Sequence, residues 1–337
     1  MNLYEAPDAP AANTAASTST ASVATVSDFV TDGSDSAGST AAGSTAAGST
    51  AAGSTAATAR FGKITAEQIS IHLGQGKAAF EAVQAVDFAI APGEFVCILG
   101  PSGCGKSTLL GALAGHITPS SGQLKLDDQT INGPSPERGM VFQHHTLFPW
   151  RSTLDNVAFG LKMRGMGKQE RMAQATEMLK LVGLEDSAER WPSQLSGGMQ
   201  QRVEIARVLI NKPRLLLMDE PFGALDAQTR MKMQELLLSI WSRIRTTVVF
   251  VTHDIDEALF LADRILVMSP RPGRIIEDLP VNFPRPRRTE LVTTAAFMQL
   301  KRHCLELLNH EEGRQLPRLS PLGLAEDAQP RLRCEIS

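Results

Sequence analysis

The most specific stretch of this chain reads Gly100-Pro101-Ser102-Gly103-Cys104-Gly105-Lys106-Ser107-Thr108. A short apolar run over 94–99 precedes it, and a helical pattern over 107–115 continues from it. Glycines in such a loop let backbone N–H groups curl around phosphate oxygens, and a helix that begins there directs the positive end of its dipole at them. The stretch therefore predicts a phosphate-binding loop for ATP, in which Lys106 reaches the β- and γ-phosphates and the Ser107 hydroxyl ligates Mg²⁺.

A second motif is an apolar strand that ends in two acidic residues, Leu215-Leu216-Leu217-Met218-Asp219-Glu220. Ligand groups collect at the carboxyl ends of strands in parallel sheets. Asp219 suits the coordination sphere of Mg²⁺, and Glu220 suits a general base that polarises an attacking water. Acidic residues end many strands, so this motif gains its specificity from the phosphate-binding loop that precedes it.

Two single polar residues, Gln143 and His253, also follow predicted strands, over 139–142 and 247–251. A neutral amide at a sheet edge can sense the γ-phosphate or its metal, so Gln143 joins the candidate Mg²⁺ ligands. A histidine can hydrogen-bond the γ-phosphate and hold the transition-state geometry. Taken separately, each is more typical of a routine polar residue at a strand end, and its assignment depends on the motifs around it.

A second glycine-rich helix start reads Leu195-Ser196-Gly197-Gly198-Met199-Gln200-Gln201-Arg202. Like the first loop, it places a helix start where backbone N–H groups can bind an anion, but it has no lysine and no metal ligand. We predict that it supplies a second face to the γ-phosphate from another subunit. The alternative is an ordinary capped helix start, which accounts for Ser196 but not for the two glycines after it.

Between these motifs, apolar strands alternate with helical patterns, which predicts an α/β fold with a largely parallel sheet covered on both faces. Two strand-like runs, 63–71 and 83–90, come before the phosphate-binding loop and form a further β portion. The stretch 144–195 has no strand pattern and predicts an inserted helical subdomain. A Pro-, Arg- and Gly-rich segment over 270–286 surrounds a short strand, and a helical pattern follows over 289–311.

Composition narrows the possible functions of this 337-residue chain. The formal net charge of −3 argues against a generally basic nucleic-acid binder, and no apolar run approaches the ~18 residues of a membrane span. Residues 1–60 are rich in Ala, Ser, Thr and Gly, with a repeating Ala-Gly-Ser-Thr-Ala pattern, and predict a disordered tail. The first basic residue is Arg60, so a secretory signal is not visible and a cytoplasmic location is expected. The four cysteines form no Cys-x-x-Cys pair and read as reduced thiols.

In combination, these motifs resemble the ATP-binding subunit of ABC transporters, over residues 63–280. By this resemblance residues 100–108 are the Walker A loop, Gln143 is the Q-loop glutamine and residues 195–200 are the signature. Residues 215–220 are the Walker B strand, residues 223–226 are the D-loop and His253 is the switch histidine. The resemblance adds Asp226 of the D-loop to the candidate nucleotide contacts. With it we expect an ATPase domain over 61–285. The sequence pattern after that domain predicts a helical C-terminal extension over 286–337 whose end is loose.

The resemblance implies partners and a location as well. Two copies would form a head-to-tail homodimer, with ATP held between Walker A of one copy and the signature of the other. The dimer would drive an integral membrane permease from the cytoplasmic face of the inner membrane, as a peripheral subunit. A periplasmic substrate-binding protein would act indirectly, and no nucleic acid would be bound.

Several short segments narrow the resemblance to the importer branch for nitrate, sulfonates and taurine. They are 137–143, 147–150, 155–157, 219–226 and 270–274. We expect taurine or another alkyl sulfonate as the transported compound, with nitrate second and a pyrimidine precursor third. The competing interpretation is a soluble ATPase of the same fold; coiled coils, zinc motifs and duplicated ATPase domains, which would favour it, are not visible in the sequence.

Two local questions stay open at the level of sequence. The family usually places an aromatic residue near the first strand to stack on adenine, whereas this chain has Leu73 there and Phe80 as the nearest aromatic. Phe80 either stacks on the base or packs in the core. Likewise, the segment 147–150, with Phe148 and Trp150, either lines a groove that receives a permease helix or packs inside the helical subdomain.

Overall fold

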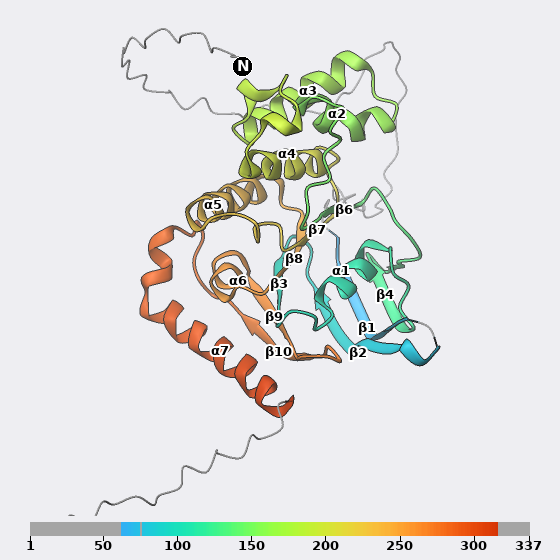
Figure 1. The fold of residues 1–337 in the computed structure, drawn as a ribbon, viewed down its shortest axis with the longest axis vertical. Coiled ribbons are helices and arrows are strands. Elements are labelled where there is room, and N and C mark those ends of the chain that lie inside the picture. The colour runs from blue at the N-terminus through green and yellow to red at the C-terminus, as the bar shows by residue number, and fades with distance from the viewer. Residues whose placement is uncertain (1–61, 75, 316–337) are drawn as a thin grey trace, which may run out of the picture. The chain divides into compact units, whose positions relative to one another are not determined.

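The structure is a computed structural model that describes residues 62–74 and 76–315. The predicted tail over 1–60 and the predicted loose end, within 316–337, lie outside the described residues. In the described part, strands and helices alternate along most of the chain, as Figure 1 shows.

A six-stranded sheet forms the centre of the fold (Figure 1), in the order β10-β9-β3-β8-β7-β6. Its strands are β3 (Phe95–Leu99), β6 (Arg138–Val141), β7 (Leu215–Asp219), β8 (Thr247–Thr252), β9 (Arg264–Met268) and β10 (Ile275–Pro280). All of them pair in parallel except β10, which pairs antiparallel with β9 at the edge. Strands β3 and β8 are buried along their whole length, which is why they read as continuous apolar runs. The predicted, mostly parallel α/β sheet is confirmed.

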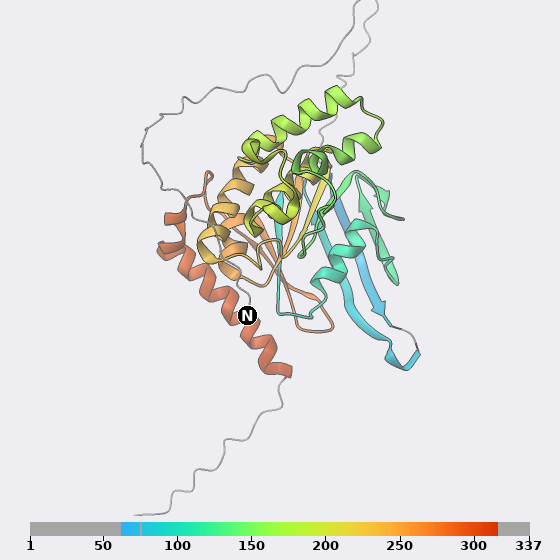
Figure 2. The ribbon, with the colours of Figure 1, turned by 45° about the horizontal axis from the view of Figure 1, so that its top comes forward.

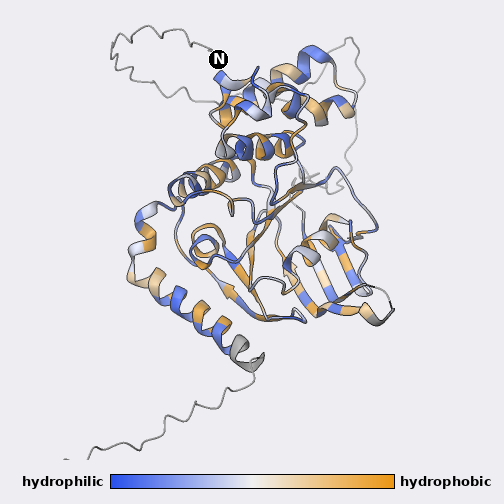
Figure 3. Ribbon diagram, in the orientation of Figure 1, coloured by the Kyte–Doolittle hydropathy of each residue, from blue (hydrophilic) through white to orange (hydrophobic). Residues whose placement is uncertain are grey.

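Alternate residues of β3 contribute to two hydrophobic cores, one on each face of the sheet. Val96 and Ile98 belong to the core shared with helix α1 (Lys106–Ala114) and with the antiparallel β portion. Phe95, Cys97 and Leu99 belong to the core shared with the other helices. Figure 3 shows the apolar residues gathered along these central strands.

The antiparallel β portion is a separate four-stranded sheet in the order β2-β1-β4-β5. Its elements are β1 (Ile64–Leu73), the 3-10 turn η1 (Gly76–Ala78), β2 (Phe80–Ile90), β4 (Ser121–Leu126) and β5 (Gln129–Thr130). The sequence pattern did not predict β4 and β5. In β4 only Leu124 and Leu126 are buried, so the strand lacks the continuous apolar run from which the buried strands were predicted.

The stretch after β6 is helical and contains no strand before β7 among the described residues. It holds α2 (Thr153–Met163), α3 (Lys168–Leu181), the 3-10 turns η2 (Glu185–Ser187) and η3 (Pro192–Gln194), and α4 (Gly197–Leu209). Side chains cap two of these helices, because Ser152 and Ser196 each accept a backbone N–H at the helix start. Helices α5 (Ala227–Ile244) and α6 (Ile255–Leu261) then connect the last parallel strands.

The C-terminal segment differs from the single helix predicted over 289–311. It forms a 3-10 helix, η4 (Thr289–Thr293), and then α7 (Ala295–Gln315), because the Thr294 hydroxyl accepts the backbone N–H of Phe297 and starts a new helix. Helix α7 is held to the domain by an ion pair between Lys301 and Asp256 at 2.7 Å. Figures 1 and 2 show α7 on the side of α6, away from the antiparallel sheet.

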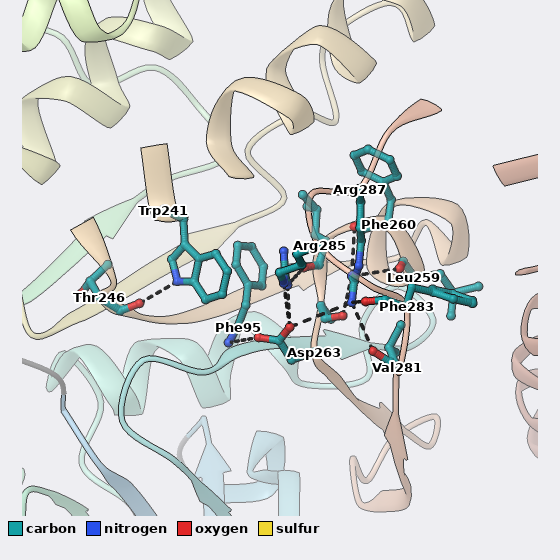
Figure 4. A network of polar contacts seen from close by, with 12 residues as sticks. Phe95, Trp241, Thr246, Leu259, Phe260, Asp263, Val281, Phe283, Arg285 and Arg287 are labelled. Atoms are coloured by element: carbon teal, nitrogen blue, oxygen red, sulfur yellow. Dashed lines mark hydrogen bonds and ion pairs between the residues drawn. The ribbon is translucent and has the colours of Figure 1, made fainter. Parts of the chain in front are cut away.

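A polar network fastens the segment between β10 and α7 to the domain, and Figure 4 shows it. Arg287 is buried and donates to the backbone carbonyls of Leu259, Phe260, Ala262, Val281 and Phe283. The first three of these carbonyls lie at the end of α6, so the guanidinium caps that helix. Burial, with repulsion from Arg285, lowers the pKa of Arg287 to about 10. The negative charge of Asp263, whose Oδ1 lies 3.9 Å from Nη2 of Arg287, acts against this lowering of the pKa. Asp263 also accepts two hydrogen bonds from Arg285.

We expect Arg287→Ala to lower the free energy of unfolding by about 3 kcal/mol, because it leaves buried carbonyl groups without donors. Urea unfolding of the full chain measures this change. The matched control is the exposed neighbour Arg288, whose replacement by alanine should change stability by no more than ~0.5 kcal/mol. Equal effects of the two substitutions would contradict a capping role for Arg287.

Candidate active site

The predicted phosphate-binding loop connects the end of β3 to the start of α1. Gly105 has a φ of 104°, a left-handed conformation that favours glycine, and a Cβ there would lie 2.6 Å from the carbonyl oxygen of Ala82. The antiparallel sheet therefore presses directly against the loop through β2. This contact explains why the loop needs glycine at position 105.

Lys106 is the first residue of α1, and its side chain is only 4% exposed. Its Nζ donates to the carbonyl oxygens of Gly100 at 2.8 Å and Pro101 at 2.9 Å. The same Nζ lies 4.0 Å from Oε1 of Glu220. A buried ammonium held by the curl of its own loop is positioned to face an anion that enters the loop.

Asp219 ends β7, and its Oδ1 accepts a hydrogen bond from the Ser107 hydroxyl at 3.0 Å. Burial raises the pKa of Asp219, and the hydrogen bond from Ser107 acts against that rise. A partly buried carboxylate beside a hydroxyl is the oxygen donor set that suits Mg²⁺, whose remaining ligands are phosphates and water. No group of three or more His, Cys, Asp or Glu side chains in 62–74 and 76–315 could hold a metal ion alone. The oxygen atoms of Ser107 and Asp219 fit a Mg²⁺ ion as two of its ligands.

Glu220 follows β7 and adopts a φ of 42°, the left-handed region that is uncommon for residues other than glycine. Its backbone N–H donates to the carbonyl of Val251 at 3.0 Å, which ties the turn to β8. Its Oε2 lies 3.1 Å from Nδ1 of His253, the residue after β8. The strained turn thus aims the carboxylate at the space between Lys106 and His253.

A cavity of about 290 Å³ opens beside these groups. The phosphate-binding loop lines it with Ser102, Gly103, Gly105, Lys106, Ser107 and Thr108, and Gln143 and Glu220 also line it. Asp219 and His253 are connected to the lining through their bonds to Ser107 and Glu220. The fold therefore brings together the predicted residues of the loop, the two strand ends and the glutamine.

The predicted signature does not reach this cavity within one copy of the chain. Ser196 is the N-cap of α4, exposed, and its hydroxyl accepts the N–H of Met199 at 3.4 Å. Gly197 is exposed as well. A Cβ at Gly198 would lie 2.9 Å from Thr229 Cγ2, so close packing against α5 accounts for this second glycine. The capped-helix interpretation therefore explains more of the motif than the sequence alone indicated.

Asp226 also lies apart from the cavity lining. It is the N-cap of α5, where its Oδ1 accepts the N–H groups of Gln228 at 3.1 Å and Thr229 at 3.0 Å. These bonds, chiefly the one from Thr229, hold the pKa of Asp226 below its ordinary value. Within a single copy the residue serves the helix start.

The rest of the cavity is lined by Leu73, Phe80, Ala82 and Arg271. Phe80 is 37% exposed, so it lies at the cavity and not in the core. Sequence reasoning missed Ala82 and Arg271. The position of Arg271 follows from the order of the strands in the sheet. Because β9 pairs in parallel with β3, the loop after β9 emerges beside the phosphate-binding loop.

Comparisons with known proteins agree with this geometry. A family model described as ABC transporter matches residues 83–223. A putative ATP-binding protein of Brucella abortus is 47% identical over 233 residues, which cover 69% of this chain and 90% of that protein. The taurine import ATP-binding protein TauB of Yersinia pestis is 54% identical over 209 residues, which cover 62% of this chain and 81% of that protein.

Solved structures of similar proteins share the fold. A dimeric bacterial ABC transporter cassette is 35% identical, with a TM-score of 0.59, and the match covers 66% of this chain and all of that one (100%). The protein cbiO1 from Clostridium perfringens, part of the ABC transporter complex cbiONQ, is 27% identical with a TM-score of 0.61. That match covers 75% of this chain and 98% of the other.

We expect Lys106→Ala to weaken binding of ATP with Mg²⁺ by about 100-fold, because charge-assisted hydrogen bonds to the phosphates are lost. Isothermal titration calorimetry measures the affinity. Lys180→Ala is the control, since Lys180 lies on the surface of α3 and pairs with Glu177. Unchanged affinity in Lys106→Ala would show that this loop does not bind the phosphates.

Proposed function

This chain belongs to the ABC transporter family of ATP-binding proteins, and we propose that it hydrolyses ATP at this site to drive a membrane importer. One observation carries the proposal. The carboxylate of Glu220 lies between Lys106 Nζ, at 4.0 Å, and His253 Nδ1, at 3.1 Å, beside the paired Ser107 and Asp219. A phosphate-binding cation, an oriented base and a donor set for a metal ion thus meet at one sheet edge.

The loop would hold the triphosphate with its backbone N–H groups, and Lys106 would contact the terminal phosphates. Ser107 and Asp219 would hold Mg²⁺, with Gln143 as a further oxygen donor from the cavity wall. When bound, Mg²⁺ neutralises charge that develops on the phosphate oxygens.

Glu220 would act as the general base that takes a proton from the attacking water. With Nδ1 protonated, His253 donates to this carboxylate and fixes its direction, while its second ring nitrogen can contact the γ-phosphate. The left-handed backbone at Glu220 sets the direction in which its side chain leaves the chain, and the contact with His253 holds the carboxylate in place.

We further propose that two copies of the chain form a head-to-tail homodimer in which the signature of one copy closes the cavity of the other. The following features support this. Ser196 and Gly197 are exposed at the start of α4, they are absent from the cavity of their own chain, and a helix start attracts anions. Asp226 caps α5 and bonds the N–H of Thr229, whose methyl group would lie 2.9 Å from a Cβ at Gly198; Asp226 would therefore face the same seam. A similar cassette has been solved as a dimer.

The partner we propose for the dimer is an integral membrane permease, docked at a groove of about 600 Å³ between the helical part of the chain and β6. Phe148, Phe159 and Met163 give this groove an apolar lining, and Arg207 lies 5.4 Å from the ring of Phe148. The two interpretations of the segment 147–150 each apply to part of it. Leu147 packs into the core, Phe148 lines the groove, and Trp150 is 68% exposed. Such a lining suits a docked helix with apolar anchors.

No helix in the described part of the chain has the length and apolar character that crossing a bilayer requires. We propose a peripheral position on the cytoplasmic face of the inner membrane, through the permease. A periplasmic substrate-binding protein would deliver the transported compound without contacting this chain. Taurine or another alkyl sulfonate is our first choice of compound and nitrate the second; the 54% identity to a taurine import ATP-binding protein supports the first.

We expect Glu220→Gln to lower phosphate release from ATP by about 100-fold or more while leaving ATP affinity nearly unchanged, because the base is lost but the charge-binding groups remain. In light scattering, the variant should accumulate as an ATP-bound dimer. Glu177→Gln on α3 provides the same charge change away from the site and should retain full turnover. Full turnover in Glu220→Gln would remove this residue as the base.

We expect taurine to stimulate ATP hydrolysis when the chain is reconstituted in proteoliposomes with its co-purifying permease and binding protein. Steady-state phosphate release, with and without each candidate compound, measures the stimulation. Stimulation by nitrate and not by taurine would reverse our order of substrates. Full hydrolysis by a dilute, strictly monomeric preparation without permease would contradict the dimer and the coupling to transport.

A further inference from the structure

Two short turns carry Glu220 and His253, one after β7 and one after β8. In the first turn the carbonyl of Glu220 accepts the N–H of Gly223 at 3.1 Å, and the N–H of Leu225 donates to the carbonyl of Phe222 at 3.1 Å. In the second turn Nδ1 of His253 lies 3.1 Å from Oε2 of Glu220. The histidine side chain is 55% exposed, so packing around the ring does not by itself fix this contact.

Arg230, on α5, makes a second connection between the two turns. Its Nη2 donates to the carbonyl of Leu225 at 3.0 Å, and its Nη1 donates to Oδ2 of Asp254 at 3.2 Å. Asp254 is the residue directly after His253. The contacts therefore form a closed ring, which runs from Glu220 to His253, on through Asp254 and Arg230, and back along the first turn.

The carboxylate of Asp254 uses its oxygens for different tasks. Oδ1 accepts the N–H groups of Asp256 at 2.9 Å and Glu257 at 3.2 Å and so caps α6, whereas Oδ2 accepts from Arg230. The cap fixes the start of α6 relative to its own turn. The bond to Arg230 fixes that turn relative to α5 and to the turn that carries Glu220.

A buried contact one helical turn further along supports the arginine. Gln234 of α5 donates from Nε2 to Oε1 of Glu257 at 3.1 Å, and these two side chains are 7% and 5% exposed. Burial raises the pKa of Glu257, and the positive charge of Arg230 acts against that rise. Because a buried polar contact is costly to break, it holds α5 and α6 in one relative arrangement. Arg230 therefore stands on a rigid support.

We propose that Arg230 is a positioning residue for ATP hydrolysis, which holds the turn of His253 against the turn of Glu220. The inference rests on the proposed function, since it assumes that these two residues act in hydrolysis. A catalytic group has to be held within about 0.5 Å of its productive position. Arg230 does not line the cavity, so it would affect turnover and not the binding of the nucleotide.

The test compares turnover with affinity in the full chain, with Mg²⁺. We expect Arg230→Ala to lower kcat for phosphate release about tenfold, because the base is misplaced in the transition state. ATP affinity, measured by isothermal titration calorimetry, should stay within about twofold of wild type. Asp254→Asn should lower kcat to a similar extent, since asparagine still caps α6 but lacks the charge that pairs with the guanidinium.

A double variant decides whether Arg230 acts through the histidine. In a chain that already carries His253→Ala, the further change Arg230→Ala should lower kcat by less than about twofold, because no histidine remains to be positioned. Structural damage unrelated to the histidine would instead multiply the two losses.

Arg243→Ala is the matched control, because Arg243 is an exposed arginine on the same helix. It should retain wild-type kcat and affinity. Thermal melting checks the folding of every variant, and Arg230→Ala should melt within about 4 °C of wild type, since it removes a half-exposed ion pair.

The proposal is overturned if Arg230→Ala retains wild-type kcat, if it weakens ATP binding as much as it slows turnover, or if its loss multiplies with that of His253→Ala. Failure of the proposed function is distinguishable from these results. It would show as full turnover in Glu220→Gln with Arg230 left in place.

Discussion

The parallel pairing of β3, β7 and β8 is the constraint on which the site depends. In this register Leu99 lies beside Thr252, and Asp219 beside Val251, so the three strands end at the same edge of the sheet. The residues that follow them are the phosphate-binding loop, Glu220 and His253. Groups separated by more than a hundred positions in the chain are therefore within hydrogen-bonding reach, as the contact between Ser107 and Asp219 shows. A shift of one residue in any of these strands would turn its terminal side chain to the other face.

Charged groups at that edge are partly removed from water, which costs desolvation free energy. Lys106 is almost fully buried, and Asp219 is partly desolvated, which raises its pKa. Such groups are tolerated because each has partners: two loop carbonyls and Glu220 for the lysine, and the Ser107 hydroxyl for the aspartate. The site is held in position by the rigid sheet below it, and the strained turn at Glu220 is stabilised by the same packing.

Hydrogen bonds attach the loop after β9 and the segment after β10 to the rest of the domain. Gly273 ties the loop after β9 to β2, and Arg271 ties the same loop to the phosphate-binding loop through the carbonyl of Gly103. Arg287 ties the segment after β10 to the end of α6. Asp254 follows His253 and caps the start of α6 at Ile255. Through these contacts the C-terminal segment helps to fix the helix that follows the histidine, so its packing and the geometry of the site are connected.

Contiguous motifs in the sequence were sufficient to predict the α/β fold, the phosphate-binding loop and the acidic strand end, because each is built from neighbouring residues whose spacing carries its chemistry. The strands β4 and β5 escaped prediction because a half-exposed strand has too few apolar residues to form a pattern. Only the tertiary structure decided that the loop after β9 lies against the phosphate-binding loop and that Phe80 meets Arg271 at the cavity wall. Both facts depend on which strands are neighbours and on how loops far apart in the chain approach one another, and local sequence contains no record of either.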